Sequence, residues 1–473
     1  MKFLNLELNG PNIIVESQRS GRARTLFWPW AGANVSLLAL SYGAFFLGFG
    51  ISFQQATYAA VIGTVLSFLV VGVSSLAGKK SNAPTMILSR AAFGTKGNIV
   101  PGLLSYLVFV GWETVLVSLA TLATGTVFAR IGHINHNLAL ILGLLVAVSL
   151  TVVGGVLGFA TIMRIQKWLT IITVLMTVLY VALTIKNVNW SALSAIKDGS
   201  SQAFIGALIF GITGIGLGWV NSAADYSRYL PREVSSKSVV GWTVLGASFV
   251  PIILVIYGSV LAGSSKNLSD AIAMDPIGAL TTLLPVWFLI PFAVIALLGL
   301  VGGAILDLYS SGLTLVSIGL PVKRHVAASI DALIMLIGTI YIVWFAGNFF
   351  IPFQGFLITL GVPVAVWSAI FVCDVLMRRK DYSQNDLFDA GGRYGSWNKS
   401  SLILMLVGSI IGWGFVTNTF APWLSWQGYF LTVIGGKSGP WANANVGVIF
   451  ALLIGFIGHF FLARKAITRQ ESF

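Results

Sequence analysis

The stretch Gly211-Ile212-Thr213-Gly214-Ile215-Gly216-Leu217-Gly218-Trp219 lies inside a long apolar run. Four glycines within eight residues weaken a regular helix, since each costs up to about 1 kcal/mol relative to alanine. Irregular helices at membrane depth are tolerated where they line a cavity, and their freed backbone groups can bind a substrate. We therefore expect an interrupted helix here, with Gly216 near a ligand. Close packing against another helix is the alternative explanation.

The composition indicates that this helix belongs to a membrane protein. The chain has 473 residues, of which 56% are hydrophobic and only 9% charged, and its mean hydropathy is +0.89. Soluble proteins carry about 25% charged residues, and a membrane-spanning helix needs about 20 apolar residues. The sequence predicts twelve such helices, at residues 30–50, 56–77, 99–122, 138–158, 168–184, 203–221, 239–262, 283–307, 327–344, 351–377, 401–420 and 444–462.

The Lys and Arg residues test this count of spans. If the amino terminus is inside, 23 of the 28 basic residues fall on the inner side, as the positive-inside rule requires. We expect a multi-pass protein of the cell (inner) membrane, surrounded by a lipid bilayer, with both termini cytoplasmic. The net charge of +13 is scattered over short loops, which argues against a nucleic-acid partner.

The predicted organisation has no soluble domain. It consists of a cytoplasmic segment (1–26), a transport core of helices 1–10 (27–377), a cytoplasmic linker (378–400), helices 11 and 12 (401–463) and a cytoplasmic tail (464–473). There is no phosphate-binding glycine loop, so nothing indicates direct use of ATP.

Two carboxyl groups lie far from water by sequence. Glu113 is near the middle of the third span, and Asp307 lies deep in the eighth, whereas Asp225, Asp331 and Asp374 are expected near inner helix ends, within reach of basic loops. A carboxylate at mid-bilayer costs several kcal/mol unless it is protonated, paired or facing water. We expect Glu113 and Asp307 to carry protons and to contact substrate. The alternative is a structural carboxyl bonded to a neighbouring polar group.

The first span carries a milder form of the glycine pattern, with Asn34 among small residues. If the first ten helices are two repeats of five, the first span corresponds to the sixth and the third to the eighth. Glu113 and Asp307 then occupy corresponding helices, as in transporters with inverted repeats and a central site. Phe109, Trp112 and Trp219 could stack on a flat ring, so we expect a small heterocyclic substrate.

The sequence resembles the nucleobase:cation symporter family, in particular its purine–cytosine permease branch, whose relatives include hydantoin, allantoin, thiamine and pyridoxine permeases. The resemblance covers nearly the whole chain and implies an all-α fold of about twelve transmembrane helices, a five-plus-five inverted repeat of the leucine-transporter type plus two helices. It is carried by four segments: 27–36 (FWPWAGANVS), 84–94 (PTMILSRAAFG), 218–231 (GWVNSAADYSRYLP) and 307–311 (DLYSS).

The resemblance also implies site residues. The family's aromatic and amide or acid on the third span match Phe109 and Glu113, its sixth-span Trp matches Trp219, and its eighth-span Asn is Asp307 here. The hydantoin branch binds sodium through first-span carbonyls and eighth-span hydroxyls. The aligned positions are Gly32, Val35, Leu298, Val301 and Gly302, so the hydroxyls are missing and H⁺ is favoured over Na⁺ as the coupling ion.

We therefore expect a secondary importer of cytosine or purine-type nucleobases that works by proton symport and alternating access, with no cofactor and no bound metal. One alternative is the same fold importing allantoin, hydroxymethylpyrimidine, pyridoxine or thiamine, with sodium as a possible coupling ion. A channel is less compatible with interrupted helices. A membrane enzyme is not expected, because no nucleophile–base pair or metal cluster is visible. The sequence leaves the oligomeric state open.

Overall fold

The computed structural model describes residues 14–155, 159–319, 324–419 and 422–472, and all regular structure in these ranges is helical. Ten helices are long and apolar enough to cross a membrane. The helix pair Ala23–Asn34 and Leu38–Leu47 forms one further span that is bent by 67°, and the shorter apolar helix Lys399–Gly414 lies at the predicted span 401–420. Every predicted span therefore corresponds to a helix or a bent helix pair.

The helices cover the predicted spans, but several ends lie up to ten residues beyond the predicted bounds, as at Gly132 in the third span and Ser317 in the eighth. The spanning elements are α1 (Phe27–Asn34) with α2 (Leu38–Leu47), α3 (Phe53–Lys80), α6 (Ile99–Gly132), α7 (His136–Gly155), α8 (Phe159–Thr184), α10 (Ser201–Gly211) with its continuation to Ser227, α12 (Ser236–Ser264), α15 (Leu289–Ser317), α16 (Arg324–Phe345), α17 (Phe350–Met377), α18 (Lys399–Gly414) and α19 (Gly447–Glu471). Short helices are α4 (Thr85–Leu88), α5 (Arg90–Phe93), α9 (Trp190–Ser194), α13 (Lys266–Met274) and α14 (Gly278–Thr281). Residues 1–13 of the predicted amino-terminal segment, and the predicted span ends at 158 and 420, lie outside the described residues.

Helix α16 illustrates how the sequence orients a span. Leu333 and Ile337 are 58% and 61% exposed, whereas Asp331, Met335 and Thr339 are fully buried. Residues four apart lie on the same face of an α-helix, so these two sets form separate stripes. The apolar stripe faces outward, where lipid surrounds the protein, and the second stripe faces the other helices.

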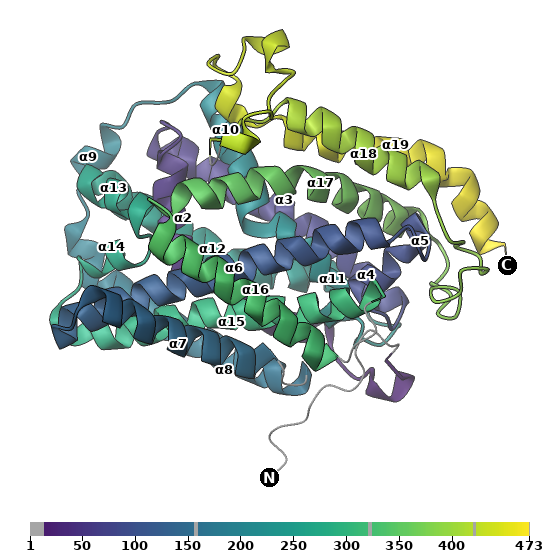
Figure 1. Ribbon diagram of the computed structural model, residues 1–473, viewed down its shortest axis with the longest axis horizontal. Helices are drawn as coiled ribbons and strands as arrows, with labels where there is room; N and C mark the ends of the chain where they lie inside the picture. Colours follow the sequence, from purple (N-terminus) through teal and green to yellow (C-terminus); the bar gives the residue numbers. More distant parts are fainter. Residues whose placement is uncertain (1–13, 156–158, 320–323, 420–421, 473) are drawn as a thin grey trace.

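The spans pack in two groups with α17 between them. Helices α6 and α15 pack along each other, and α7, α8 and α16 surround them. In the other group, α12 packs on α1, α2 and α3, and α3 packs on the sixth span. Helices α18 and α19 pack on α17 along one edge of the molecule (Figure 1).

The first span is the sharply interrupted one. It breaks between Asn34 and Leu38, where Asn34 Nδ2 donates to the carbonyl of Trp30 (2.9 Å) and Ser36 Oγ accepts from the N–H of Leu38 (3.3 Å). The second bond satisfies an N–H group at the start of α2 that has no partner within the helix. The expectation that the first span carries the milder irregularity is therefore wrong.

The sixth span stays continuous from Ser201 to Ser227. Its hydrogen-bond pattern changes to a π-helical turn, η4 (Ile212–Gly216), and then to a 3₁₀ segment, η5 (Leu217–Ser222), before α11 (Ala223–Ser227). Close packing explains part of the glycine pattern, because a Cβ on Gly216 would lie 2.2 Å from Ser67 Oγ of α3. The glycines thus change the winding of the span without interrupting its axis.

Segments that were predicted to share the inner side do meet on one face. Arg19 donates to the carbonyls of Leu230 and Lys79 (both 2.7 Å), and Arg232 pairs with Asp381 (2.5 Å). The amino-terminal segment and the segments after α3, α11 and α17 therefore lie together, on what we call the arginine-rich face. Helices α9, α13 and α14 lie at the opposite face (Figure 1).

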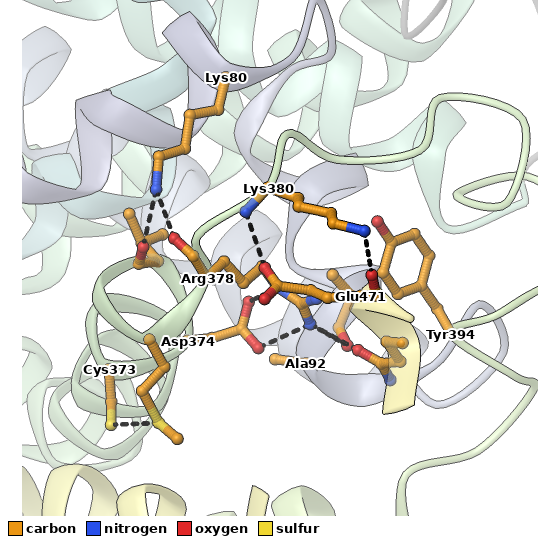
Figure 2. A network of polar contacts seen from close by, with 12 residues as sticks. Lys80, Ala92, Cys373, Asp374, Arg378, Lys380, Tyr394 and Glu471 are labelled. Atoms are coloured by element: carbon orange, nitrogen blue, oxygen red, sulfur yellow. Dashed lines mark hydrogen bonds and ion pairs between the residues drawn. The ribbon is translucent and has the colours of Figure 1, made fainter. Parts of the chain in front are cut away.

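A buried ion pair lies at the carboxyl-terminal end of α17, on the arginine-rich face (Figure 2). Arg378 donates through Nε and Nη2 to Asp374 (2.7 and 2.9 Å) and through Nη2 to Gln470 (2.8 Å). Lys80 Nζ donates to the carbonyls of Val375 and Arg378 (3.3 and 2.8 Å). The ends of α3, α17 and α19 are tied together by these contacts.

We predict that Asp374→Asn destabilises the protein by about 3–5 kcal/mol, because it leaves the Arg378 charge buried without its partner. The exposed pair Lys266–Asp270 offers a matched control, and Asp270→Asn should change stability by less than about 1 kcal/mol. Thermal denaturation of the purified protein in detergent measures both. Equal melting temperatures for the two variants would contradict the role of the buried pair.

Candidate functional site

A small internal cavity lies where the first and sixth spans are irregular. Its volume is about 50 Å³, and it is enclosed by the α1–α2 break, α6, the π-helical turn and α12. Ligand pockets usually have volumes of about 300–1,000 Å³, so the site is contracted in this conformation. The lining residues are Ala33, Asn34, Ser36, Leu38, Ala39, Tyr42, Trp112, Leu116, Gly214, Ile215, Trp219 and Pro251.

Two tryptophans from different spans face this cavity. Trp112 comes from α6 and Trp219 from η5. Trp219 meets Trp30 edge to face, with ring centroids 5.9 Å apart, and Trp112 meets Phe353 in the same way at 5.5 Å. Gly218 lets the ring of Trp112 lie close to the backbone of η5, because a Cβ there would lie 2.9 Å from Trp112 Nε1. The structure thus brings together two of the three aromatic residues that were predicted to stack on a flat ring.

Asn34 lies at the same cavity, as predicted. Its amide nitrogen is used by the carbonyl of Trp30, which fixes the orientation of the side chain. The amide oxygen Oδ1 then remains as an acceptor at the cavity wall. A mostly apolar cavity with a few fixed polar groups is typical of small-molecule sites.

Aromatic side chains separate the cavity from a wider vestibule of about 430 Å³ at the opposite face. Tyr42 donates its hydroxyl to the carbonyl of Gly214 (2.8 Å) and stacks on Phe353 of α17 (centroids 6.2 Å apart). Phe45 packs on Phe350 at 4.5 Å. These contacts join α2, the sixth span and α17 into a closed layer between cavity and vestibule.

Glu113 and Asp307 are brought together, but not at the cavity. They are 0% and 3% exposed, and neither is among the residues that line it. The nearest charged neighbours of Glu113 are Asp331 and Asp307, and Ser311 also lies beside it. Glu113 Oε1 and Oε2 and Asp307 Oδ2 accept no hydrogen bond from the described residues. The proximity of the two carboxyls agrees with the correspondence of the third and eighth spans.

Sequence reasoning missed Asp331 as a member of this cluster. Its place near the start of a span suggested contact with basic loops, yet it is fully buried and accepts a hydrogen bond from Ser311 Oγ. The signal that could have found it is its four-residue spacing from Met335 and Thr339, which marks the inward stripe of α16.

Phe109 and Gly216 were also predicted as substrate residues. Phe109 is 1% exposed and does not line the cavity, and Gly216 packs against Ser67 of α3. Their neighbours Trp112 and Ile215 line the cavity instead. The choice between neighbouring residues depends on the rotation of each helix about its axis, which spacing alone does not determine.

Three of the four family-like segments meet at Asp225, and the fourth contacts Trp219. Asp225 Oδ1 accepts from the N–H and hydroxyl of Thr85 (both 2.8 Å), and Oδ2 accepts from Ser310 (2.9 Å). Trp30 packs edge to face on Tyr226 (5.2 Å) as well as on Trp219. Asp225 therefore connects α4, α11 and α15 directly below the cavity-lining tryptophan.

Carbonyl groups at the first-span break face α15. A Cβ on Gly299 would lie 3.2 Å from the carbonyl oxygen of Val35, and one on Gly303 would lie 3.6 Å from that of Ala33. These carbonyls therefore approach α15 at Gly299 and Gly303. The hydroxyl groups expected of a sodium site are absent from positions 298, 301 and 302.

Comparison with known proteins gives consistent results. A family model described as permease for cytosine/purines, uracil, thiamine, allantoin matches residues 13–433. A putative purine-cytosine permease of Bacillus subtilis is 24% identical over 467 residues, covering 97% of this chain and 96% of that protein. A purine-cytosine permease of Saccharomyces cerevisiae is 26% identical over 276 residues, which cover 56% of this chain and 49% of that protein.

Solved structures show the same fold. A nucleobase-cation-symport-1 family transporter, in a closed conformation with bromovinylhydantoin bound, matches with a TM-score of 0.70 at 19% identity, over 100% of both chains. An inward-facing conformation of that transporter matches with a TM-score of 0.67. A sodium-coupled sialic acid symporter matches at 0.56, with 12% identity over 94% of this chain and 91% of that chain. The fold class predicted from the sequence is confirmed.

We predict that Asp225→Ala lowers the stability of the protein by roughly 3 kcal/mol, because three buried donors lose their acceptor. Ser248→Ala serves as the control, since Ser248 bonds only to the carbonyl of Val244 within its own helix, and should cost about 1 kcal/mol or less. Thermal denaturation in detergent compares the two. A smaller loss for Asp225→Ala than for Ser248→Ala would contradict the connecting role of Asp225.

Proposed function

Because the chain belongs to the family of permeases for cytosine/purines, uracil, thiamine and allantoin, we propose that it imports cytosine or purine-type nucleobases by proton symport with alternating access. Its family and fold make it a secondary transporter of nucleobase-type compounds rather than an enzyme. The observation that supports the substrate class is the cavity between Trp112 and Trp219 at the irregular parts of two spans.

A nucleobase suits this cavity chemically. It is a flat aromatic ring with donors and acceptors on its edge, so it can stack on indole faces. Stacking of a base on an aromatic side chain is worth about 1–3 kcal/mol. In the proposed complex Trp112 and Trp219 hold the ring faces and Asn34 Oδ1 accepts from an N–H on the ring edge.

The closed layer above the cavity suggests the first step of the cycle. Substrate would reach the vestibule and enter when Tyr42 releases the carbonyl of Gly214 and α17 moves away from α2. Closure would restore the Tyr42 bond to the π-helical turn and the stack on Phe353. The cavity of about 50 Å³ must widen to admit a ring.

We propose that the arginine-rich face is cytoplasmic and that the vestibule opens to the outside of the cell membrane. The basis is the concentration of Lys and Arg in segments that meet on that face, as the positive-inside rule describes. With this orientation, the described start of the chain lies on the cytoplasmic side, and so does the carboxyl-terminal end of α19.

Protons are the proposed coupling ion. Glu113, Asp307 and Asp331 lie together without an ion pair among the described residues. A buried carboxyl without a cationic partner favours its neutral, protonated form. The missing hydroxyls at positions 298, 301 and 302 further disfavour sodium.

We predict saturable uptake of radiolabelled cytosine into proteoliposomes under an inward proton gradient, inhibited by unlabelled adenine and hypoxanthine. Trp219→Ala should weaken the apparent affinity roughly 5- to 150-fold, because it removes one stacking face. Trp287→Ala is the matched control, since Trp287 is 63% exposed and lies outside the cavity.

The competitors in this assay also separate the alternatives. Uptake that is blocked by allantoin, pyridoxine or thiamine but not by purines would replace the proposed substrate class. Uptake that requires sodium and ignores the proton gradient would overturn proton coupling. Equal affinities for Trp219→Ala and Trp287→Ala would remove Trp219 from the substrate site.

A further inference from the structure

The carboxyl cluster lies where three helices meet, apart from the cavity. Helix α6 packs on both α15 and α16, and α15 packs on α16. These helices contribute Glu113, Asp307 and Asp331, respectively, and Asp331 is the immediate charged neighbour of both other acids. The cluster therefore joins the core helices α6 and α15 to the outer helix α16.

The oxygens of this cluster are short of donors. Ser311 Oγ donates to Asp331 Oδ2, but Asp331 Oδ1 and both oxygens of Glu113 receive no hydrogen bond from the described residues. The Tyr106 hydroxyl, on a side chain that is 7% exposed, lies beside Asp331 and is a further donor for that carboxyl. A buried carboxylate without donors is costly, whereas a protonated carboxyl supplies its own donor.

Among the described side chains, none with a positive charge acts on Glu113, Asp307 or Asp331. Facing groups from the packed helices are Tyr106 of α6 and Tyr226 of α11, which lies beside Asp307. Arg228 lies beside Asp225. Helix α7 has its only titratable residue, His136, at its first position, and Lys167 of α8 lies over the ring of Trp28.

The cluster lies between the cavity and the arginine-rich face. Tyr106 and Asp331 are each seven residues from the end of their helix at that face, which corresponds to about 10 Å. Side chains on a helix lean toward its amino terminus, so Glu113 reaches from α6 toward the same level. On the cavity side, Asp307 neighbours Tyr226, which packs on Trp30 beside Trp219.

We propose that Glu113 and Asp331 form the proton-binding site of the transport cycle, a carboxyl pair that shares a proton between α6 and α16. This inference rests on the proposed function and adds Asp331 as the second half of the site. Two carboxylates in contact inside a protein cannot both stay ionised, so the pair keeps one proton and binds or releases a second. Only O–H bonds form and break, and the proton comes from and returns to solvent.

The position of the pair would couple its protonation to substrate binding in the cavity. Asp307 connects the pair to the aromatic wall of the cavity through Tyr226 and Trp30, and Ser311 of α15 holds Asp331 in place. A shift of α15 or α6 during closure would change the distance between the two carboxyls, and with it the number of protons that they hold.

The test compares wild type, Asp331→Asn and the matched control Thr339→Val in proteoliposomes with labelled cytosine. Thr339 lies on the same buried stripe of α16 and has no hydrogen-bond partner among the described residues, so its replacement changes polarity without touching the pair. Each protein is assayed in exchange of labelled for unlabelled cytosine at equal pH, and in accumulation under a gradient of about one pH unit.

For a one-to-one symporter, one pH unit supports about tenfold accumulation. We expect wild type and Thr339→Val to approach this ratio. Asp331→Asn should exchange cytosine but reach only about equal concentrations inside and outside, because the remaining carboxyl keeps its proton. Accumulation by Asp331→Asn equal to wild type would overturn the proposal. Exchange without proton-driven accumulation in wild type would instead overturn the proposed proton coupling.

Ser311→Ala provides the deciding measurement if Asp331→Asn loses exchange as well. This variant keeps both carboxyls and removes the hydroxyl that donates to Asp331. Since that hydrogen bond favours the ionised form, its loss should shift the pH profile of uptake toward alkaline pH. An unshifted profile, with normal exchange, would contradict a role for Asp331 in binding the proton.

Discussion

Inside an apolar layer, each backbone carbonyl and each carboxylate needs a donor, a cation or a proton, and this constraint governs the whole molecule. Regular helices satisfy it for most of the chain. Where the first span resumes after its break, Ser36 Oγ accepts from the N–H of Leu38, and where the sixth span changes its winding, Tyr42 donates to the carbonyl of Gly214. The side chains that make both hydrogen bonds also line the cavity, so the proposed substrate site lies where the backbone is irregular.

The same constraint separates the acidic residues into two kinds. Asp225 and Asp374 are buried with full sets of donors, and they hold helices together. Glu113 and Asp331 are buried beside each other, and only one of their four oxygens, Oδ2 of Asp331, accepts a hydrogen bond from Ser311, so they lack that compensation. Carboxyls of the first kind stabilise the fold, whereas those of the second kind can change their proton content during a transport cycle.

Much of the fold was accessible from the sequence because hydropathy and basic loops report on lipid and on sidedness. The spans, the shared face of the basic segments and the approach of Glu113 to Asp307 all followed from such patterns. The rotation of each helix did not, so Phe109 and Gly216 were expected beside the substrate together with Trp112, whereas Trp112 and Ile215 line the cavity. The sharper break in the first span has only a mild signal in the sequence, since the hydrogen bonds at it are local ones made by Asn34 and Ser36. The burial of Asp331 was missed because its position near a helix end suggested contact with loops, although Asp331, Met335 and Thr339 form a buried stripe.

The most direct test of the account is to follow protons and substrate together in proteoliposomes without an imposed gradient. Cytosine is added to one side while a pH-sensitive dye reports the external medium and a radiolabel reports uptake. The account predicts that the medium becomes more alkaline as cytosine enters, and that sodium is not required. Entry of cytosine without any proton movement, or only in the presence of sodium, would contradict it.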